Sequence, residues 1–147
     1  MFVYIKNMVR ISNLKILNIL EKNSRIPFVK IAKKLGVTDT AIRKRVEKME
    51  ERGVIRSYTL EVDPRKLGFQ VNALIGIDTE PEYYISMIEK LKRLEKVRNL
   101  YSSTGDHMIM MKCWFKTSEE LTEFIKKLES TQGVTRVCPA IILERVK

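Results

Sequence analysis

Apolar residues recur at helical spacing in three short segments near the start of the chain. The first segment follows Ser12, a good helix cap, and its apolar positions predict a broad buried face: Leu14, Ile16, Leu17, Ile19 and Leu20. The second begins at Pro27, ends before Gly36, and has these apolar positions: Phe28, Ile31, Ala32 and Leu35. The third follows Thr38 and ends at Gly53, with an i, i+4, i+7 stripe of Ile42, Val46 and Met49. The pattern therefore predicts three helices.

The second and third predicted helices form a helix-turn-helix pattern, because only a short turn containing Gly36 separates them. Burial of the apolar stripe turns the polar residues of the third helix outward, so we predict a recognition helix from about Thr38 to Arg52 in a major groove. The predicted DNA-binding residues are Thr38, Thr40, Arg43, Lys44, Arg45, Lys48 and Arg52. Thr40, Arg43 and Lys44 are placed to reach base edges or phosphates, and Arg45, Lys48 and Arg52 are placed to reach phosphates. The alternative is a three-helix bundle whose charges only face solvent.

The period of the pattern changes after residue 54. Residues 55–62 alternate apolar and polar side chains, which predicts a half-buried linking strand, and residues 63–68 predict a turn. The following segments predict a strand at 71–78, a helix from Pro81, strands at 97–103 and 107–115, a helix capped by Ser118 that closes near Gly133, and a strand at 134–146. The order βαββαβ predicts a ferredoxin-like unit with an antiparallel sheet and helices on one face.

These elements predict an α+β fold with four parts. Residues 1–9 form an N-terminal arm, 10–54 a helix-turn-helix domain, 55–68 the linker strand and turn, and 69–147 the βαββαβ domain. The helix from Pro81 is expected to bury Tyr84, Ile85, Ile88, Leu91 and Leu94. The strand at 107–115 is apolar on both faces, and a sheet face without a covering helix is an aggregation liability. We therefore expect that face to meet another subunit, so that the C-terminal domain makes the oligomer.

The net charge of +10 is concentrated in the first half of the chain. Residues 1–70 hold 16 lysines and arginines against 7 acids, whereas residues 71–147 hold 12 against 11. A basic half joined to a near-neutral half indicates a module that binds a polyanion and a second module with another task. A basic surface that only confers solubility is the alternative, but together with the helix-turn-helix pattern the charge favours double-stranded DNA.

Several classes of protein and site are not indicated by the sequence. Apolar runs fall short of the ~20 residues that a membrane helix needs, and Cys113 and Cys138 are too few for a disulfide framework or a structural zinc site. We therefore expect a cytoplasmic protein without a membrane partner. His107 is the only histidine, and we expect it to make one hydrogen bond at a strand or loop edge. The chain shows no metal-ligand cluster and no phosphate-cradling glycine loop, so we expect no metal, no cofactor and no enzymatic activity.

The chain resembles the Lrp/AsnC (feast/famine) transcriptional regulators. The segments that carry the resemblance occur in family order over residues 10–147: Leu14-Lys15-Ile16-Leu17, Asn23-Ser24-Arg25, Ile31 to Gly36, Arg45 to Ile55, Asp63 to Gly68, Thr104-Gly105-Asp106 and Gly133-Val134. The resemblance implies dimers that assemble further, often into octamers, and pseudo-palindromic DNA targets. It also implies what many members have, a small amino-acid effector held between dimers by the C-terminal domain. Where family members usually carry aspartate in the first helix, this chain has Asn13.

The resemblance places the effector site at Gly105, Asp106 and His107 and at the facing residues Val137, Cys138 and Pro139. Family members often read Gly-Asp-Tyr-Asp at the first position and carry small hydroxyl residues at the second. Burying the charged groups of an amino acid without partners costs roughly 2–7 kcal/mol per polar group. Asp106 and backbone groups could hold an ammonium, but we identify no side chain that replaces the hydroxyls for a carboxylate. We therefore expect no amino-acid effector, or one held by backbone groups alone.

Some alternatives stay open at this stage. Arg98 or Lys112 of a neighbouring dimer would complete the effector site and restore ordinary affinity. An architectural protein that wraps DNA with little specificity, or an amino-acid-sensing domain that regulates an enzyme, would share the same pattern. Residues 1–7 precede Met8, so they form either an added arm or a misassigned start. The sequence does not distinguish an activator from a repressor.

Overall fold

The computed structural model describes residues 12–147, and the chain divides into two compact units between Glu61 and Val62. Each unit has an apolar core of its own. The predicted N-terminal arm, residues 1–9, lies outside the described residues. Within residues 12–147, no helix is both long and apolar enough to cross a bilayer.

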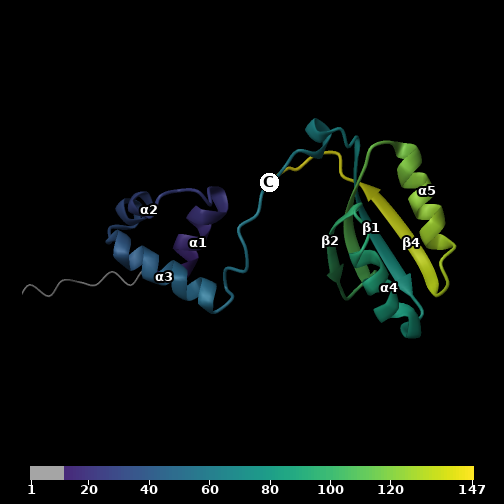
Figure 1. Cartoon of the computed structure of the whole chain (residues 1–147), viewed down its shortest axis with the longest axis horizontal. Helices are drawn as coiled ribbons and strands as arrows, with labels where there is room; N and C mark the ends of the chain where they lie inside the picture. The colour runs from purple at the N-terminus through teal and green to yellow at the C-terminus, as the bar shows by residue number, and fades with distance from the viewer. Residues whose placement is uncertain (1–11) are drawn as a thin grey trace, which may run out of the picture. The chain divides into compact units, whose positions relative to one another are not determined.

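The first unit is a bundle of three helices, α1 (Asn13–Lys22), α2 (Phe28–Leu35) and α3 (Asp39–Glu51) (Figure 1). The hydroxyls of Ser12 and Thr38 accept hydrogen bonds from backbone N–H groups in the first turns of α1 and α3, as predicted. Gly36 ends α2 at a φ of 68°, a left-handed conformation that glycine adopts without strain. The core joins the three helices through Ile16, Leu20, Ile31, Ala32, Ile42, Val46 and Met49. Leu14, predicted to be buried, is 64% exposed in the first turn of α1.

The linking strand predicted at 55–62 is wrong for the single chain. Residues 55–63 form no strand, because a strand needs a neighbour for its backbone hydrogen bonds and no other segment of the described chain pairs with them. The alternating apolar side chains are exposed instead: Tyr58 by 52%, Leu60 by 81% and Val62 by 40%. The turn that follows is a 3-10 helix, η1 (Pro64–Leu67), capped by Asp63.

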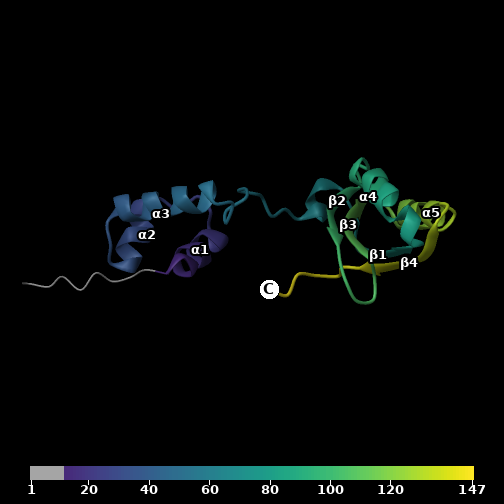
Figure 2. The ribbon, with the colours of Figure 1, turned by 90° about the horizontal axis from the view of Figure 1, so that it is seen from below.

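The second unit has the predicted βαββαβ order. Its elements are β1 (Val71–Thr79), η2 (Pro81–Tyr83), α4 (Tyr84–Lys92), β2 (Val97–Ser102), β3 (Ile109–Phe115), α5 (Ser118–Glu129) and β4 (Val134–Ile141). The strands lie in the order β2-β3-β1-β4 and are antiparallel throughout, which is the ferredoxin-like arrangement. Both helices lie on the same side of the sheet (Figure 2).

The two faces of the sheet differ in their surroundings. Alternate residues of β1 and β3, such as Ile75 and Met111, form the core with α4 and α5. The intervening residues lie on the other face, which we call the open face: Asn72, Leu74, Gly76 and Asp78 on β1, and Met110, Lys112 and Trp114 on β3. No helix of the described chain covers the open face, as predicted.

Four predicted details of the second unit are wrong. Thr117, not Ser118, caps α5, because its hydroxyl accepts the hydrogen bond from the N–H of Glu120. Ile85 is 68% exposed, and Met87 is buried in its place at the turn of α4 that faces the sheet. β3 begins at Ile109 rather than at His107. β4 ends at Ile141. Ile142 still donates its backbone N–H to the carbonyl of Asn72, but residues 142–147 form no strand.

Candidate nucleic-acid interface and effector region

The predicted recognition helix presents most of its predicted residues to solvent. Burial of Ile42, Val46 and Met49 leaves these polar residues of α3 and its end exposed: Thr40, Arg43, Lys44, Lys48 and Arg52. The Thr38 hydroxyl is engaged in capping, since its Oγ1 accepts from the N–H of Ala41 at 3.2 Å. The structure therefore brings the predicted DNA-binding residues onto the exposed part of a single capped helix.

Charge is divided along α3. Residues 39–45 carry the cations Arg43, Lys44 and Arg45 against one acid, Asp39, whereas residues 46–51 carry one cation, Lys48, against three acids. Tyr58 of the linker donates a hydrogen bond to Glu50 (2.6 Å), and this bond together with burial raises the pKa of Tyr58 to about 12. The N-terminal half of α3 is therefore the part suited to face a phosphate backbone.

Two arginines of α3 are held by uncharged partners from the other helices. The guanidinium of Arg43 lies over the ring of Phe28 in α2, with its carbon 5.4 Å from the ring centroid. Arg45 is half-buried, and its Nη1 donates a hydrogen bond to Oδ1 of Asn13 in α1 at 2.9 Å. Sequence analysis missed both partners, because each lies on a separate helix of the bundle. Neither contact neutralises the arginine's charge.

The predicted effector region contains an ion-pair network, which we call the Asp78 network. His107 places Nδ1 3.0 Å from Oδ2 of Asp78 and Nε2 3.3 Å from Oδ2 of Asp106. Arg136 donates from Nε to Oδ2 of Asp78 (2.7 Å) and from Nη2 to Oδ1 of Asp106 (3.1 Å). The N–H of Met108 donates to the other oxygen of Asp78. The expectation of a single hydrogen bond for His107 is therefore wrong.

The remaining predicted effector residues lie around this network. Gly105 is exposed at a φ of 101° in the loop before β3, and the side chain of Asp106 is 80% exposed. Cys138 is paired with Gly76 across the strands, Val137 packs against the core, and Pro139 is exposed. Residues 137–139 pair with residues 75–77 in the second half of β1, and His107 and Arg136 both contact Asp78 near the end of that strand.

Sequence analysis missed two members of the Asp78 network, Asp78 and Arg136. Arg136 is a side chain that donates to carboxylates, to those of Asp78 and Asp106, and the sequence analysis did not name it. A lone acid at the end of the apolar run of β1 was the available signal for Asp78. Among residues 12–147, no cluster of three or more histidines, cysteines or acids is placed to hold a metal ion.

The charge of Asp78 is stabilised by its donors. Burial disfavours the ionised form, but hydrogen bonds from Arg136, the N–H of Met108 and His107 outweigh burial and hold the pKa of Asp78 below its ordinary value. A carboxyl group whose pKa is lower in the folded state adds stability at neutral pH. That stability is complete above the ordinary pKa near 3.9 and is lost as the pH falls through the lowered value.

Replacement of Asp78 by asparagine should therefore destabilise the protein at neutral pH and much less in acid. We expect a loss of roughly 1.5–3 kcal/mol at pH 7, because bonds to a charged acceptor are lost and Arg136 loses a partner. Urea unfolding at pH 7 and at pH 3 measures the difference. Glu89→Gln is the control, since the pKa of Glu89 is lowered by an exposed pair with Lys92. A loss of equal size at both pH values would contradict this account.

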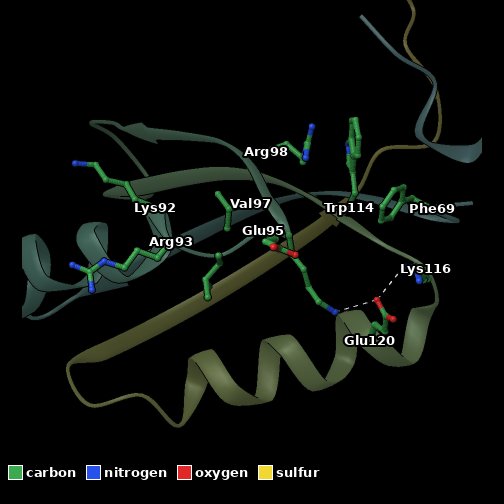
Figure 3. A pocket seen from close by; sticks show the side chains of 11 residues that line it. Phe69, Lys92, Arg93, Glu95, Val97, Arg98, Trp114, Lys116 and Glu120 are labelled. Carbon is green, nitrogen blue, oxygen red and sulfur yellow. Dashed lines mark hydrogen bonds and ion pairs between the residues drawn. The ribbon is translucent and has the colours of Figure 1, made fainter. Parts of the chain in front are cut away.

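A groove of about 820 Å³ lies elsewhere in the second unit, beside the start of β2 and the end of β3 (Figure 3). Trp114 forms one wall, with the guanidinium of Arg98 4.5 Å from its ring and Phe69 at 5.6 Å between ring centroids. Lys96 forms an ion pair with Glu120 at 3.1 Å across the groove. None of the predicted effector residues lines this groove, and Arg98 is engaged there.

Comparison with known proteins agrees with both units. A model described as winged helix-turn-helix DNA-binding matches residues 10–56, and one described as Lrp/AsnC ligand binding domain matches residues 72–147. The HTH-type transcriptional regulator LrpA of Pyrococcus horikoshii is 51% identical over 133 residues, which cover 90% of this chain and 94% of the relative. The chain belongs to the Lrp/AsnC family.

Solved structures agree with this assignment. The structure of E. coli AsnC is 31% identical, has a TM-score of 0.76, and is matched over 93% of this chain and 95% of its own. B. subtilis LrpC is 25% identical with a TM-score of 0.78, over 91% of this chain and 94% of its own. The prediction of a DNA-binding transcriptional regulator rather than an enzyme is confirmed by these relatives.

Proposed function

We propose that this member of the Lrp/AsnC family is a sequence-specific regulator that acts in the cytoplasm and binds a pseudo-palindromic operator as a dimer or larger assembly. The observation that carries the proposal is the first half of α3, where Thr40, Arg43 and Lys44 are exposed on a helix capped by Thr38. Arginine and lysine at the start of a recognition helix can hydrogen-bond to guanine O6 and N7.

Selection of duplexes from a random pool with the full chain tests this proposal. A sequence-specific regulator enriches one motif and binds it ~10³–10⁷-fold more tightly than random duplex at physiological salt. The architectural alternative predicts similar affinity for selected and random duplexes. A pool that yields no motif would therefore contradict the proposal and favour DNA wrapping.

The open face supports the proposed dimer. It exposes Leu74 by 36% and Tyr101 by 55%, and Tyr101 lies beside Met110 in the pairing of β2 with β3. A second copy placed face to face would bury these side chains, and a two-fold dimer matches an operator with two half-sites. The exposed alternation of Tyr58, Leu60 and Val62 suits a further pairing between the linkers of two copies.

A lysine on the open face should dissociate the assembly. Replacement of Leu74 by lysine would bury a charge at the centre of the proposed interface, which costs several kcal/mol unless it is paired. Light scattering should show at least a dimer for the wild type and a monomer for Leu74→Lys. Ile85→Lys, which adds the same charge at an exposed position of α4, should stay oligomeric. A monomeric wild type would contradict the proposed dimer. If both variants dissociated equally, the result would contradict the proposal that the open face is the interface.

The Asp78 network supplies groups for an amino-acid effector. Asp106 is largely exposed, and Nη1 of Arg136 makes no hydrogen bond within residues 12–147. In the proposed site, Arg136 binds the carboxylate and Asp106 binds the ammonium, beside Gly105, His107 and Cys138. The structure of a regulator from Neisseria meningitidis, 19% identical with a TM-score of 0.80 over 91% of this chain and 89% of its own, is described as an L-Met complex.

A thermal shift over the twenty amino acids tests the effector. A ligand at ~100 times its dissociation constant adds ~2.7 kcal/mol to the folded state, which raises the melting temperature by several degrees. At least one amino acid should give this shift, and Asp106→Asn should abolish it without moving the melting temperature of the free protein much. An unchanged melting temperature with all twenty would contradict the proposed site.

A further inference from the structure

The contact between Arg43 and Phe28 joins the recognition helix α3 to the first turn of α2. Phe28 is the first residue of α2 and is half-buried against the core of the first unit, so its ring has a fixed place. The Arg43 side chain is exposed and reaches back from α3 to lie over this ring. The contact therefore joins an exposed side chain to a residue that packs against the core.

Two acidic residues of α3 lie at the spacing at which they could form an ion pair with Arg43. Asp39 lies one turn before it and Glu47 one turn after it, both at the spacing at which helical ion pairs form. Among the described residues, Arg43 forms an ion pair with neither of them. The contact that the structure shows for the guanidinium of Arg43 is thus with the ring of Phe28.

An aromatic partner differs from a carboxylate in what it leaves free. A carboxylate takes up the N–H groups of a guanidinium and cancels its charge, whereas a ring contacts its flat face and uses no N–H donor. The N–H groups of Arg43 therefore stay available for the two acceptors of a guanine. Ordering the side chain before DNA binds also lowers the entropy that is lost when it does.

We propose that Phe28 is a positioning residue for base recognition, an aromatic platform that holds the guanidinium of Arg43 ready to read a base in the major groove. This inference rests on the proposed role of Arg43 in reading the operator. Phe28 itself need not contact DNA.

Operator binding by full-length variants tests the platform, with the duplex selected by the wild type and a random duplex as probes. Phe28→Leu keeps an apolar side chain in the core but has no ring, and we expect about two- to fivefold weaker binding of the selected duplex. Binding of random duplex should not change, since the charge of Arg43 remains. Phe28→Tyr should bind like the wild type. Val29→Ala, at an exposed position next in α2, should also bind like the wild type.

A double-mutant cycle separates positioning from a general effect on the fold. In an Arg43→Ala background, Phe28→Leu should cause no further loss of affinity. An equal loss in both backgrounds would overturn the platform, because Phe28 would then act independently of Arg43.

A measurement on the free protein separates this inference from the proposed function. The ring current of Phe28 should shift the Nε–H signal of Arg43 in the NMR spectrum, and Phe28→Leu should remove that shift. If no such shift exists in the wild type, the platform is wrong. If the shift is present but Arg43→Ala leaves operator binding intact, the base-reading role of Arg43 fails, and the positioning role of Phe28 fails with it.

Discussion

Replacement of Arg43 by alanine is expected to weaken operator binding by about 1–3 kcal/mol, or roughly 5- to 150-fold. A bidentate arginine–guanine contact contributes a free energy of that size to discrimination between bases. The preference of the protein for guanine should therefore weaken at one position of each half-site. Affinity for random duplex should fall only by the contribution of one charge. Gel shifts on the selected duplex and on its single-base variants measure both effects.

Arg93→Ala is the matched control for Arg43. Arg93 lies in the second unit, at the end of α4, and forms no ion pair within residues 12–147. Its removal changes the net charge equally, so any loss shared by the two variants reports charge alone. Unchanged affinity and unchanged base preference in Arg43→Ala would show that α3 is not the reading helix, or that Thr40 and Lys44 read without Arg43.

Replacement of Gly76 by alanine is expected to destabilise the second unit by about 1–3 kcal/mol through overpacking. A Cβ atom at Gly76 would lie 2.3 Å from Cδ2 and 2.5 Å from Cγ of the His107 ring, far inside van der Waals contact. The ring would have to leave its place, and its contacts with Asp78 and Asp106 would be lost with it. Urea unfolding at pH 7 measures the change in the free energy of unfolding.

Removal of the His107 ring tests whether this clash causes the destabilisation expected for Gly76→Ala. His107→Ala alone should also destabilise, because the Asp78 network loses a member. In the His107→Ala background, however, Gly76→Ala should cost little, since the space beside the strand is then empty. Additive losses would show that alanine strains the strand itself rather than the ring.

The sequence predicted an element well where its boundary depends only on neighbouring residues. Pro27, Gly36 and Thr38 mark the ends of α2 and the start of α3 by their own backbone preferences, and the structure follows them. Ser118 failed as a cap because Thr117, which can also cap a helix, lies one position earlier and its hydroxyl accepts from the N–H of Glu120. The linking strand failed because no segment of residues 12–147 pairs with residues 55–62, whatever the alternation of their side chains.

The contacts of the candidate sites join residues that are far apart in the sequence. The sequence predicted some of the residues in these sites but not their partners. The pair of Asp78 and Arg136 joins residues 58 positions apart and requires the register of β1 with β4, which apolar alternation does not specify to the residue. The contact of Arg45 with Asn13 spans 32 positions and requires the packing angle of α1 against α3. Residue type located the cations of α3, whereas only the fold identified what holds them.

The uncharged amide that holds Arg45 bears on the salt dependence expected of DNA binding. A cation that neutralises a phosphate releases condensed counterions, and each such contact adds about −0.9 to the slope of log affinity against log salt. Asn13 orients Arg45 without cancelling its charge. The phosphate contact predicted for Arg45 should therefore lower affinity by about 3.5-fold for a fourfold rise in salt. An aspartate in the same place would itself act as the counterion. We therefore expect the occupancy of DNA to respond to ionic strength through an arginine that is held by a residue without charge.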